Sequence, residues 1–167
     1  MNNYNPFRLK KGFTLIELLI GMAIMGLILG GVFNFWSHAV RSQMHNAEMA
    51  ANMQAGRMII MSTNDEVRNA VTIASPTIGN PSSTLIYRLA SDTANRSISI
   101  GTGSDANTLL INKGGTVTRL GQGRVTALTF SIDSTNAKKV NLSVTLHNAS
   151  LANAPTEIVN TAVVMLN

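Results

Sequence analysis

The stretch that decides the fold is Lys10-Lys11-Gly12-Phe13-Thr14-Leu15-Ile16-Glu17-Leu18-Leu19-Ile20-Gly21. Two basic residues precede a glycine, and the glycine precedes an apolar run that holds one carboxylate near its start. No Asp, Glu, Lys or Arg occurs from Leu18 to Val40. A membrane-spanning helix needs about 20 mostly apolar residues, so this segment is long enough to cross a bilayer.

Glu17 is the residue that an ordinary membrane anchor would lack. A charged side chain costs roughly 2.5–3.5 kcal/mol at the centre of a membrane helix on insertion scales, and less near its end. A buried carboxylate is tolerated mainly when a cation pairs with it. The sequence therefore predicts a partner for the charge of Glu17.

The residues before Phe13 form a short polar leader with three cations, Arg8, Lys10 and Lys11. A secretory signal peptide is cleaved after its apolar core, whereas here the small residue comes before it. The positive-inside rule keeps this leader in the cytoplasm and directs the C-terminus outward. Loss of the leader would lower the net charge from +5 to +2 on side chains, so the basic composition alone does not indicate nucleic-acid binding.

This order of basic residues, Gly12, Phe13-Thr14-Leu15-Ile16-Glu17 and apolar run closely resembles the N-terminus of a type IV prepilin. The resemblance implies that a prepilin peptidase cleaves between Gly12 and Phe13. It also implies that the new amino group of Phe13 is N-methylated and that Glu17 is the matching acid of the family. The alternative, an uncleaved signal anchor, leaves Glu17 without a role.

The resemblance implies that, in a filament, Glu17 of one subunit meets the Phe13 amine of a neighbouring subunit. Such a pair would set the axial register, because only one offset between the helices satisfies both charges. A contact between Glu17 and the amine of its own chain, or snorkelling toward the membrane surface, remains open as an addition.

One helix is predicted from about Thr14 to about Val71, roughly 85 Å long, since no proline occurs between Phe7 and Ser75. Its first half is apolar as far as Trp36, an aromatic residue typical of the membrane interface. Its second half carries small and flexible residues at spacings of three and four, which we expect to face a covering domain. This stripe consists of Val40, Met44, Ala47, Ala51, Ala55, Met58 and Ser62.

Glycines in the apolar half allow two interpretations. Gly26 and Gly30 have the GxxxG spacing of closely packed helices, and Gly21 and Gly31 lie nearby. Local melting of the helix after it leaves the bilayer is the other interpretation, and the absence of proline favours packing.

Histidines and acids suggest no metal or catalytic site. His38 and His45 share a helix face with Glu48, but two histidines on one helix lack the further ligands of a closed site. The chain has no cysteine, which excludes a thiol nucleophile and a disulfide framework. We therefore predict no metal, no cofactor and no enzymatic activity.

Beyond Pro76 the sequence changes to short β-like runs, which favour an antiparallel meander packed on the second half of the helix. The fold class is thus α+β, with a transmembrane first half of the helix and a β-sheet head, as in the type IV pilin fold. The predicted divisions are a leader (1–12), a transmembrane or filament-core helix (13–36), its amphipathic continuation (37–72) and the head (73–167). The predicted strands are 84–89, 98–100, 108–112, 116–120, 125–132, 139–147 and 158–166, with turns at 111–116 and 133–136.

A weaker likeness to PilW/PulJ-type minor pilins and pseudopilins extends along the chain. It is carried by Met53-Gln54, by 64–70, by 125–130 and by the ending 161–167. The paired cysteines that staple the C-terminal loop of many major pilins are absent. Asp133 with Asn136 offers too few oxygen ligands for a calcium loop. These departures favour a minor subunit.

The sequence thus predicts a structural subunit, of the minor kind, in a type IV pilus or a type II secretion pseudopilus. Its partners would be other pilin or pseudopilin subunits, the prepilin peptidase and methyltransferase, and an inner-membrane assembly platform. It would wait in the cytoplasmic membrane as a single-pass protein with its C-terminus outside, and then enter a cell-surface or periplasmic filament.

The alternative is a competence or adhesion pilin whose head binds DNA or a surface. Nucleic-acid binding needs clustered cations, and Lys113, Arg119 and Arg124 are the candidates near one hairpin. A cluster of this size is more often a solvated protein face.

Overall fold

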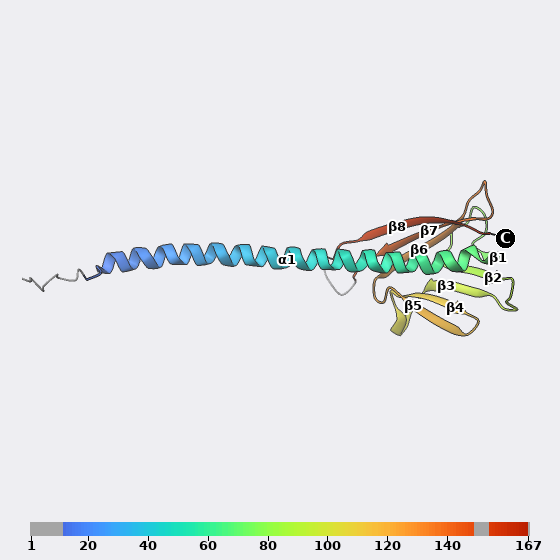
Figure 1. Cartoon of the computed structure of the whole chain (residues 1–167), viewed down its shortest axis with the longest axis horizontal. Helices are drawn as coiled ribbons and strands as arrows, with labels where there is room; N and C mark the ends of the chain where they lie inside the picture. Colours follow the sequence, from blue (N-terminus) through green and yellow to red (C-terminus); the bar gives the residue numbers. More distant parts are fainter. Residues whose placement is uncertain (1–11, 149–153, 167) are drawn as a thin grey trace, which may run out of the picture. The chain divides into compact units, whose positions relative to one another are not determined.

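A computed structural model describes residues 12–148 and 154–166, so the leader cations Arg8, Lys10 and Lys11 lie outside the described residues. The chain divides into two compact units, residues 1–43 and 44–167. In the described part, a single α-helix precedes eight strands and a short 3-10 turn, η1 (Gly103–Asp105) (Figure 1). The elements are α1 (Leu15–Arg68), β1 (Ala70–Ser75), β2 (Leu85–Leu89), β3 (Arg96–Ile100), β4 (Leu109–Lys113), β5 (Thr116–Leu120), β6 (Val125–Ile132), β7 (Lys139–Leu146) and β8 (Glu157–Val164). The predicted α+β architecture is confirmed.

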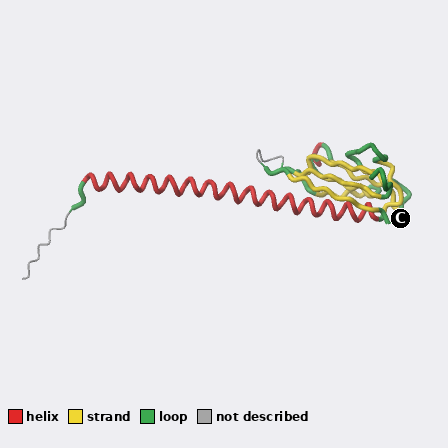
Figure 2. Tube along the Cα trace, turned by 90° about the horizontal axis from the view of Figure 1, so that it is seen from above, coloured by secondary structure: helices red, strands yellow, loops and turns green. Residues whose placement is uncertain are grey.

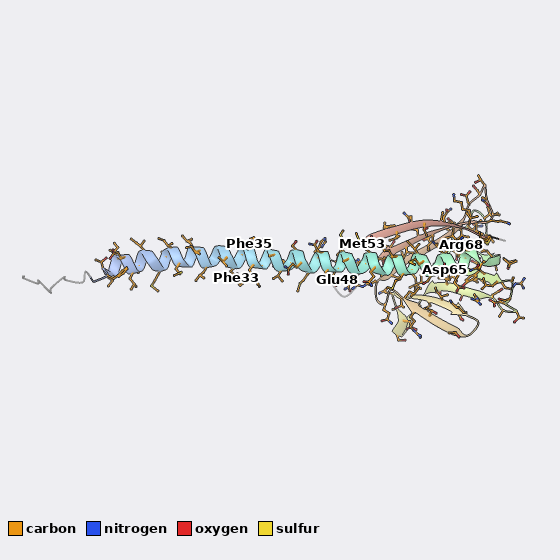
Figure 3. The ribbon with its side chains drawn as sticks, in the orientation of Figure 1. Phe33, Phe35, Glu48, Met53, Asp65 and Arg68 are labelled. Carbon is orange, nitrogen blue, oxygen red and sulfur yellow. The ribbon has the colours of Figure 1, made fainter. Side chains whose placement is uncertain are left out.

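The first half of α1 is apolar around its whole circumference. Phe33 and Phe35 point to opposite sides of the helix, and 74% and 75% of their surfaces are exposed (Figure 3). The helix is continuous through Gly21, Gly26, Gly30 and Gly31, and open space surrounds each of these glycines. A helix that is apolar all round requires burial in a membrane or against other helices, because the described part of the chain does not bury it.

The second half of α1 packs in the head through a different face from the predicted one. Of the predicted stripe only Ala55 is buried, whereas Met44 and Met58 are 65% and 45% exposed. The prediction failed because it considered only small and flexible residues, whereas the polar Asn52 and Glu66 find partners inside the head. The buried face consists of Asn52, Ala55, Gly56, Ile59, Thr63, Glu66 and Val67.

The helix ends at Arg68, earlier than the predicted Val71, and a strand that the sequence reading missed begins at Ala70. The Asn69 side chain donates a hydrogen bond to the Asp65 carbonyl oxygen (2.8 Å), which caps the last turn. The Leu166 N–H donates to the Arg68 carbonyl oxygen (3.0 Å). Beyond this point the β-branched Val71, together with its neighbours, favours a strand over a helix.

The predicted strands are each observed within two residues of their expected ends, but they form two sheets rather than one meander. The first sheet has the order β1-β2-β3-β4-β5 and the second the order β6-β7-β8, with antiparallel neighbours throughout. Both predicted turns are confirmed, since Lys113 pairs with Thr116 around Gly114 and the 133–136 segment joins β6 to β7.

The break between the sheets lies at Gly121. This residue has a φ of +60°, and a Cβ there would lie 3.0 Å from both Ile59 Cδ1 and Val125 Cγ2. The Arg124 N–H donates to the Gly121 carbonyl oxygen (2.9 Å), which turns the chain away from β5. The Val125 N–H then donates to the Asn107 carbonyl oxygen (2.8 Å) instead of to β5. The sequence reading paired successive strands and did not detect this turn.

Within the head, the two sheets lie on opposite sides of the second half of α1 in Figure 1 and to one side of it in Figure 2. The sheets approach each other at β3 and β6. The helix therefore packs on the side where the two sheets diverge, and its buried face completes the core.

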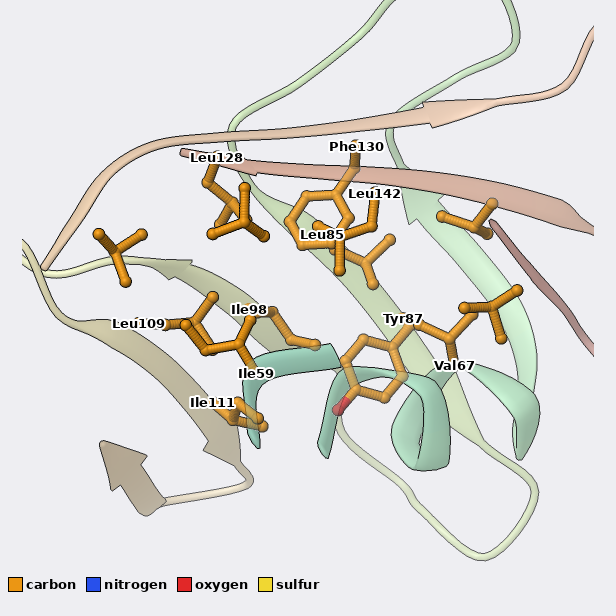
Figure 4. Close-up of a cluster of buried hydrophobic side chains, with 14 of the residues drawn as sticks. Ile59, Val67, Leu85, Tyr87, Ile98, Leu109, Ile111, Leu128, Phe130 and Leu142 are labelled. Carbon is orange, nitrogen blue, oxygen red and sulfur yellow. The ribbon is translucent and has the colours of Figure 1, made fainter. Parts of the chain in front are cut away.

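The core is built from both sheets and the helix, as Figure 4 shows. Ile59 and Val67 come from α1, Leu85 and Tyr87 from the first sheet, and Phe130 from the second. All five side chains are at most 1% exposed. Full burial of a large apolar side chain contributes about 1.5–3 kcal/mol each, so this cluster is the main source of head stability.

Glu66 is the charged residue at the base of this core, and its carboxylate has three partners. The Tyr87 hydroxyl donates to Glu66 Oε2 (2.8 Å), as does Arg96 Nη1 (3.0 Å), and Lys113 Nζ lies 2.5 Å from Oε1. Burial raises the pKa of Glu66, but the hydrogen bonds from Lys113, Tyr87 and Arg96 outweigh burial and bring this pKa below its ordinary value of 4.5. The carboxylate thus ties α1 to strands β2, β3 and β4.

This shift predicts acid sensitivity of the head. Because folding lowers the pKa of Glu66, its ionised carboxylate contributes to the free energy of unfolding. This contribution is fully present above about pH 4.5 and is lost as the pH falls through the pKa of Glu66 in the folded state. Glu66→Gln should lower the free energy of unfolding by about 1–3 kcal/mol at neutral pH and flatten the acid limb of the stability profile. Urea unfolding of the detergent-solubilised chain, followed by near-ultraviolet circular dichroism at several pH values, measures both effects. Asp105→Asn is the control variant, because it removes one charge of the more exposed ion pair with Arg119. Equal losses of unfolding free energy in both variants would contradict the role of Glu66.

Candidate functional site

The candidate site is the start of α1, where Thr14 and Glu17 cap the helix reciprocally. The Glu17 N–H donates to Thr14 Oγ1 (3.3 Å), while the Thr14 N–H and hydroxyl both donate to Glu17 Oε2 (3.0 and 2.9 Å). The Leu18 N–H donates to the Thr14 carbonyl oxygen (3.3 Å), the first bond of the helix. This is a capping box, which satisfies backbone groups that a helix end leaves unpaired.

The cap occupies one oxygen of Glu17 and leaves the other available. All of the hydrogen bonds of this carboxylate within the described residues end on Oε2. A carboxylate can accept hydrogen bonds at both oxygens, so Oε1 retains the capacity to bind a further donor. The cap thus holds the Glu17 carboxylate in one orientation at the start of an apolar helix.

The bond between Gly12 and Phe13 lies immediately before this cap, outside any helix or strand. Phe13 is 85% exposed, and a Cβ at Gly12 would meet no atom of the described chain within 4 Å. Packing inside the chain therefore gives no reason for a glycine here. An exposed, non-helical bond is the kind of segment that a peptidase can reach.

The helix that follows is long and apolar enough to cross a membrane. Its most apolar 18-residue window has a mean hydropathy of 2.3, and none of that window is buried within the chain. The position of this helix near the N-terminus fits membrane anchoring.

The three cations considered for nucleic-acid contact do not form a free cluster, because each lies against a different carboxylate. Lys113 pairs with Glu66 as described above, and Arg119 Nε lies 2.9 Å from Asp105 Oδ1. Arg124 Nη1 lies 2.6 Å from Glu48 Oε2 and also donates to Asn52 Oδ1 (2.8 Å). Phosphate binding depends on cations that can release counterions, and these three are already neutralised within the head.

Glu48 also has a structural role in the head, rather than a role as a metal ligand together with His38 and His45. Hydrogen bonds from Arg124 and Asn148 lower its pKa. Among the described residues, no group of three or more His, Asp or Glu side chains is arranged to hold a metal ion.

Sequence reasoning singled out Glu17 but missed the role of Thr14. The signal was present as Thr14-Leu15-Ile16-Glu17, a threonine three residues before a glutamate at the start of an apolar run. The predicted buried stripe did not include Glu66. Its burial had no signal in the local pattern, because Tyr87, Arg96 and Lys113 come from distant strands.

The cap predicts that Thr14→Val weakens the first turn of α1. Loss of the hydroxyl should cost about 1 kcal/mol locally, so the Glu17 amide should exchange its hydrogen several-fold faster. Hydrogen exchange of the full chain in detergent micelles measures this, with Thr14→Ser as the control that keeps the hydroxyl. An unchanged rate in Thr14→Val would contradict the cap.

Comparison with known proteins finds one relevant family model. The prokaryotic N-terminal methylation motif matches residues 7–33, which include Gly12, Phe13 and Glu17. No curated protein matches the chain, and no solved structure matches it.

Proposed function

We propose that this chain, which carries the N-terminal methylation motif of type IV pilin-like subunits, is a minor structural subunit of a type IV pilus or a type II secretion pseudopilus. One observation carries the proposal most directly. A helix that is apolar on all sides begins with a capped carboxylate, directly after an exposed bond between glycine and phenylalanine. A pilin-type subunit is a structural protein rather than an enzyme.

Maturation would begin with cleavage after Gly12 by a prepilin peptidase. The exposure of Phe13 and the absence of helix at this bond support access for such an enzyme. Cleavage creates an amino group on Phe13, which is then N-methylated. Methylation keeps the amine basic, so Phe13 would carry a positive charge close to neutral pH.

Assembly would bury the apolar half of α1 among the helices of neighbouring subunits. In such a core a carboxylate is tolerated when it is paired, and the amine of a neighbour's Phe13 is the matching cation. The free Oε1 of Glu17 supports this role, because the cap already holds the side chain in place through Oε2. Only one axial offset would satisfy both charges, so the pair would set the register of the subunits.

Composition supports a minor subunit rather than a major one. The chain has no cysteine with which to staple its C-terminal loop. Asp133 accepts hydrogen bonds from the Thr135 backbone and hydroxyl and lies 2.9 Å from Lys139 Nζ. These partners lower the pKa of Asp133 and occupy it within a turn. No observation favours nucleic-acid binding by the head over assembly.

Intact mass spectrometry tests the maturation step. Protein extracted from the membranes of a host with prepilin peptidase should begin at methylated Phe13. A chain that retains residues 1–12 in that host would refute the class of function proposed here. Gly12→Asp should block cleavage and serves as the uncut reference.

Substitution of Glu17 tests the register. Glu17→Val should leave cleavage and membrane insertion intact and reduce the amount of chain in sheared filaments by about tenfold or more, because the helix loses the charge that selects one offset. Ile20→Val is the matched control, since it alters the same helix without touching the charge. Normal incorporation of Glu17→Val would show that the charge pair does not set the register.

A further inference from the structure

Helix α1 starts two residues beyond the bond between Gly12 and Phe13. Its first helical residue is Leu15, and the Thr14 carbonyl oxygen accepts the first backbone hydrogen bond of the helix, from the Leu18 N–H (3.3 Å). Thr14 is therefore the N-cap residue, the last residue before the regular helix. The position of this cap decides whether the backbone at Gly12 belongs to the helix.

The hydroxyl of Thr14 holds the start of the helix at this position. Thr14 Oγ1 accepts the Glu17 N–H (3.3 Å), a donor that in a longer helix would bond to the Phe13 carbonyl oxygen one turn earlier. This bond uses the backbone of Glu17 and not its carboxylate. The hydroxyl and the carboxylate of the capping box therefore have separable roles.

A competing helix start exists two residues earlier, at Gly12. Glycine ranks close to threonine as an N-cap residue. In a helix capped by Gly12, the Gly12 carbonyl oxygen would accept the Ile16 N–H, as the Thr14 carbonyl oxygen accepts the Leu18 N–H in this structure. Here no described residue donates to the Gly12 carbonyl oxygen. Packing does not select between the two starts, because Phe13 is exposed and open space surrounds Gly12.

Hydrolysis of the bond between Gly12 and Phe13 requires this carbonyl group to be free. Water adds to the Gly12 carbonyl carbon, and the C–N bond to Phe13 breaks. The hydroxyl of the water stays on the new Gly12 carboxyl group, and its hydrogen passes to the Phe13 amine. Negative charge develops on the carbonyl oxygen during the addition, and donors of the enzyme must stabilise it. An oxygen that already accepts a hydrogen bond inside a helical turn is not available to those donors.

We propose that Thr14 is a positioning residue for removal of the leader. Its hydroxyl fixes the start of α1 at Leu15 and so keeps the Gly12 carbonyl group outside the helix, where a prepilin peptidase can reach it. Thr14 acts through the backbone and touches no reacting atom. This inference rests on the proposed function, since it concerns the cleavage step. It assigns Thr14 to processing, whereas the carboxylate of Glu17 serves assembly.

Cleavage kinetics of the full chain in detergent, with purified prepilin peptidase, test the inference. Thr14→Ala removes the hydroxyl and places the best helix former in the competing turn, whereas the β-branched side chain of valine would disfavour that turn. The peptidase binds only the share of chain with a free Gly12 carbonyl group. The apparent KM of Thr14→Ala should therefore rise about fivefold at unchanged kcat. Thr14→Asn is the matched control, because asparagine also caps helices and should keep the original KM.

A proline substitution distinguishes the position of the helix start from direct recognition of the hydroxyl. Leu15→Pro fixes the start, because proline suits the first helical position and disfavours helix in the residue before it. The double variant Thr14→Ala/Leu15→Pro should therefore have the same KM as Leu15→Pro alone.

Three outcomes would overturn the inference and leave the proposed function intact. They are an unchanged KM in Thr14→Ala, a loss of kcat alone in that variant, and a double variant whose KM stays about fivefold above that of Leu15→Pro. Failure of the peptidase to cleave the unmodified chain would overturn both the inference and the proposed function.

Discussion

Apolar helical surface that the described residues of the chain leave exposed is the constraint on which the rest of this molecule depends. From Leu15 to Trp36 the helix α1 exposes large side chains in every direction, and the described head covers only residues of its second half. The hydrophobic effect requires this surface to leave water. A bilayer can meet that requirement, and so can a bundle of like helices.

Within that surface, Glu17 is the one carboxylate in an otherwise uniform apolar stretch of helix. Apolar packing is tolerant of sliding, because neighbouring apolar side chains of similar size are nearly equivalent. Glu17 is not equivalent to its neighbours, and the capping box with Thr14 holds its Oε2, whereas no described residue donates to its Oε1. The cap thus stabilises the first turn of the helix and fixes the position of the Glu17 carboxylate.

The head uses a second carboxylate for a different purpose. Glu66 lies at the base of the core and bonds to side chains from three strands of the first sheet. The second sheet contributes apolar side chains such as Phe130 and Leu142 to the same core.

The order of residues alone determined the long helix, its apolar first half, the prominence of Glu17 and most of the strands. These features depend on local patterns: an uninterrupted apolar run, the absence of proline, and alternation along strands such as β7. Only the tertiary structure decided which face of α1 is buried, where the helix ends and how the strands divide into two sheets. Those outcomes depend on partners that are distant in sequence, such as Tyr87 for Glu66, Leu166 for Arg68 and Ile59 for Gly121, and no local pattern encodes a contact that only the folded chain creates.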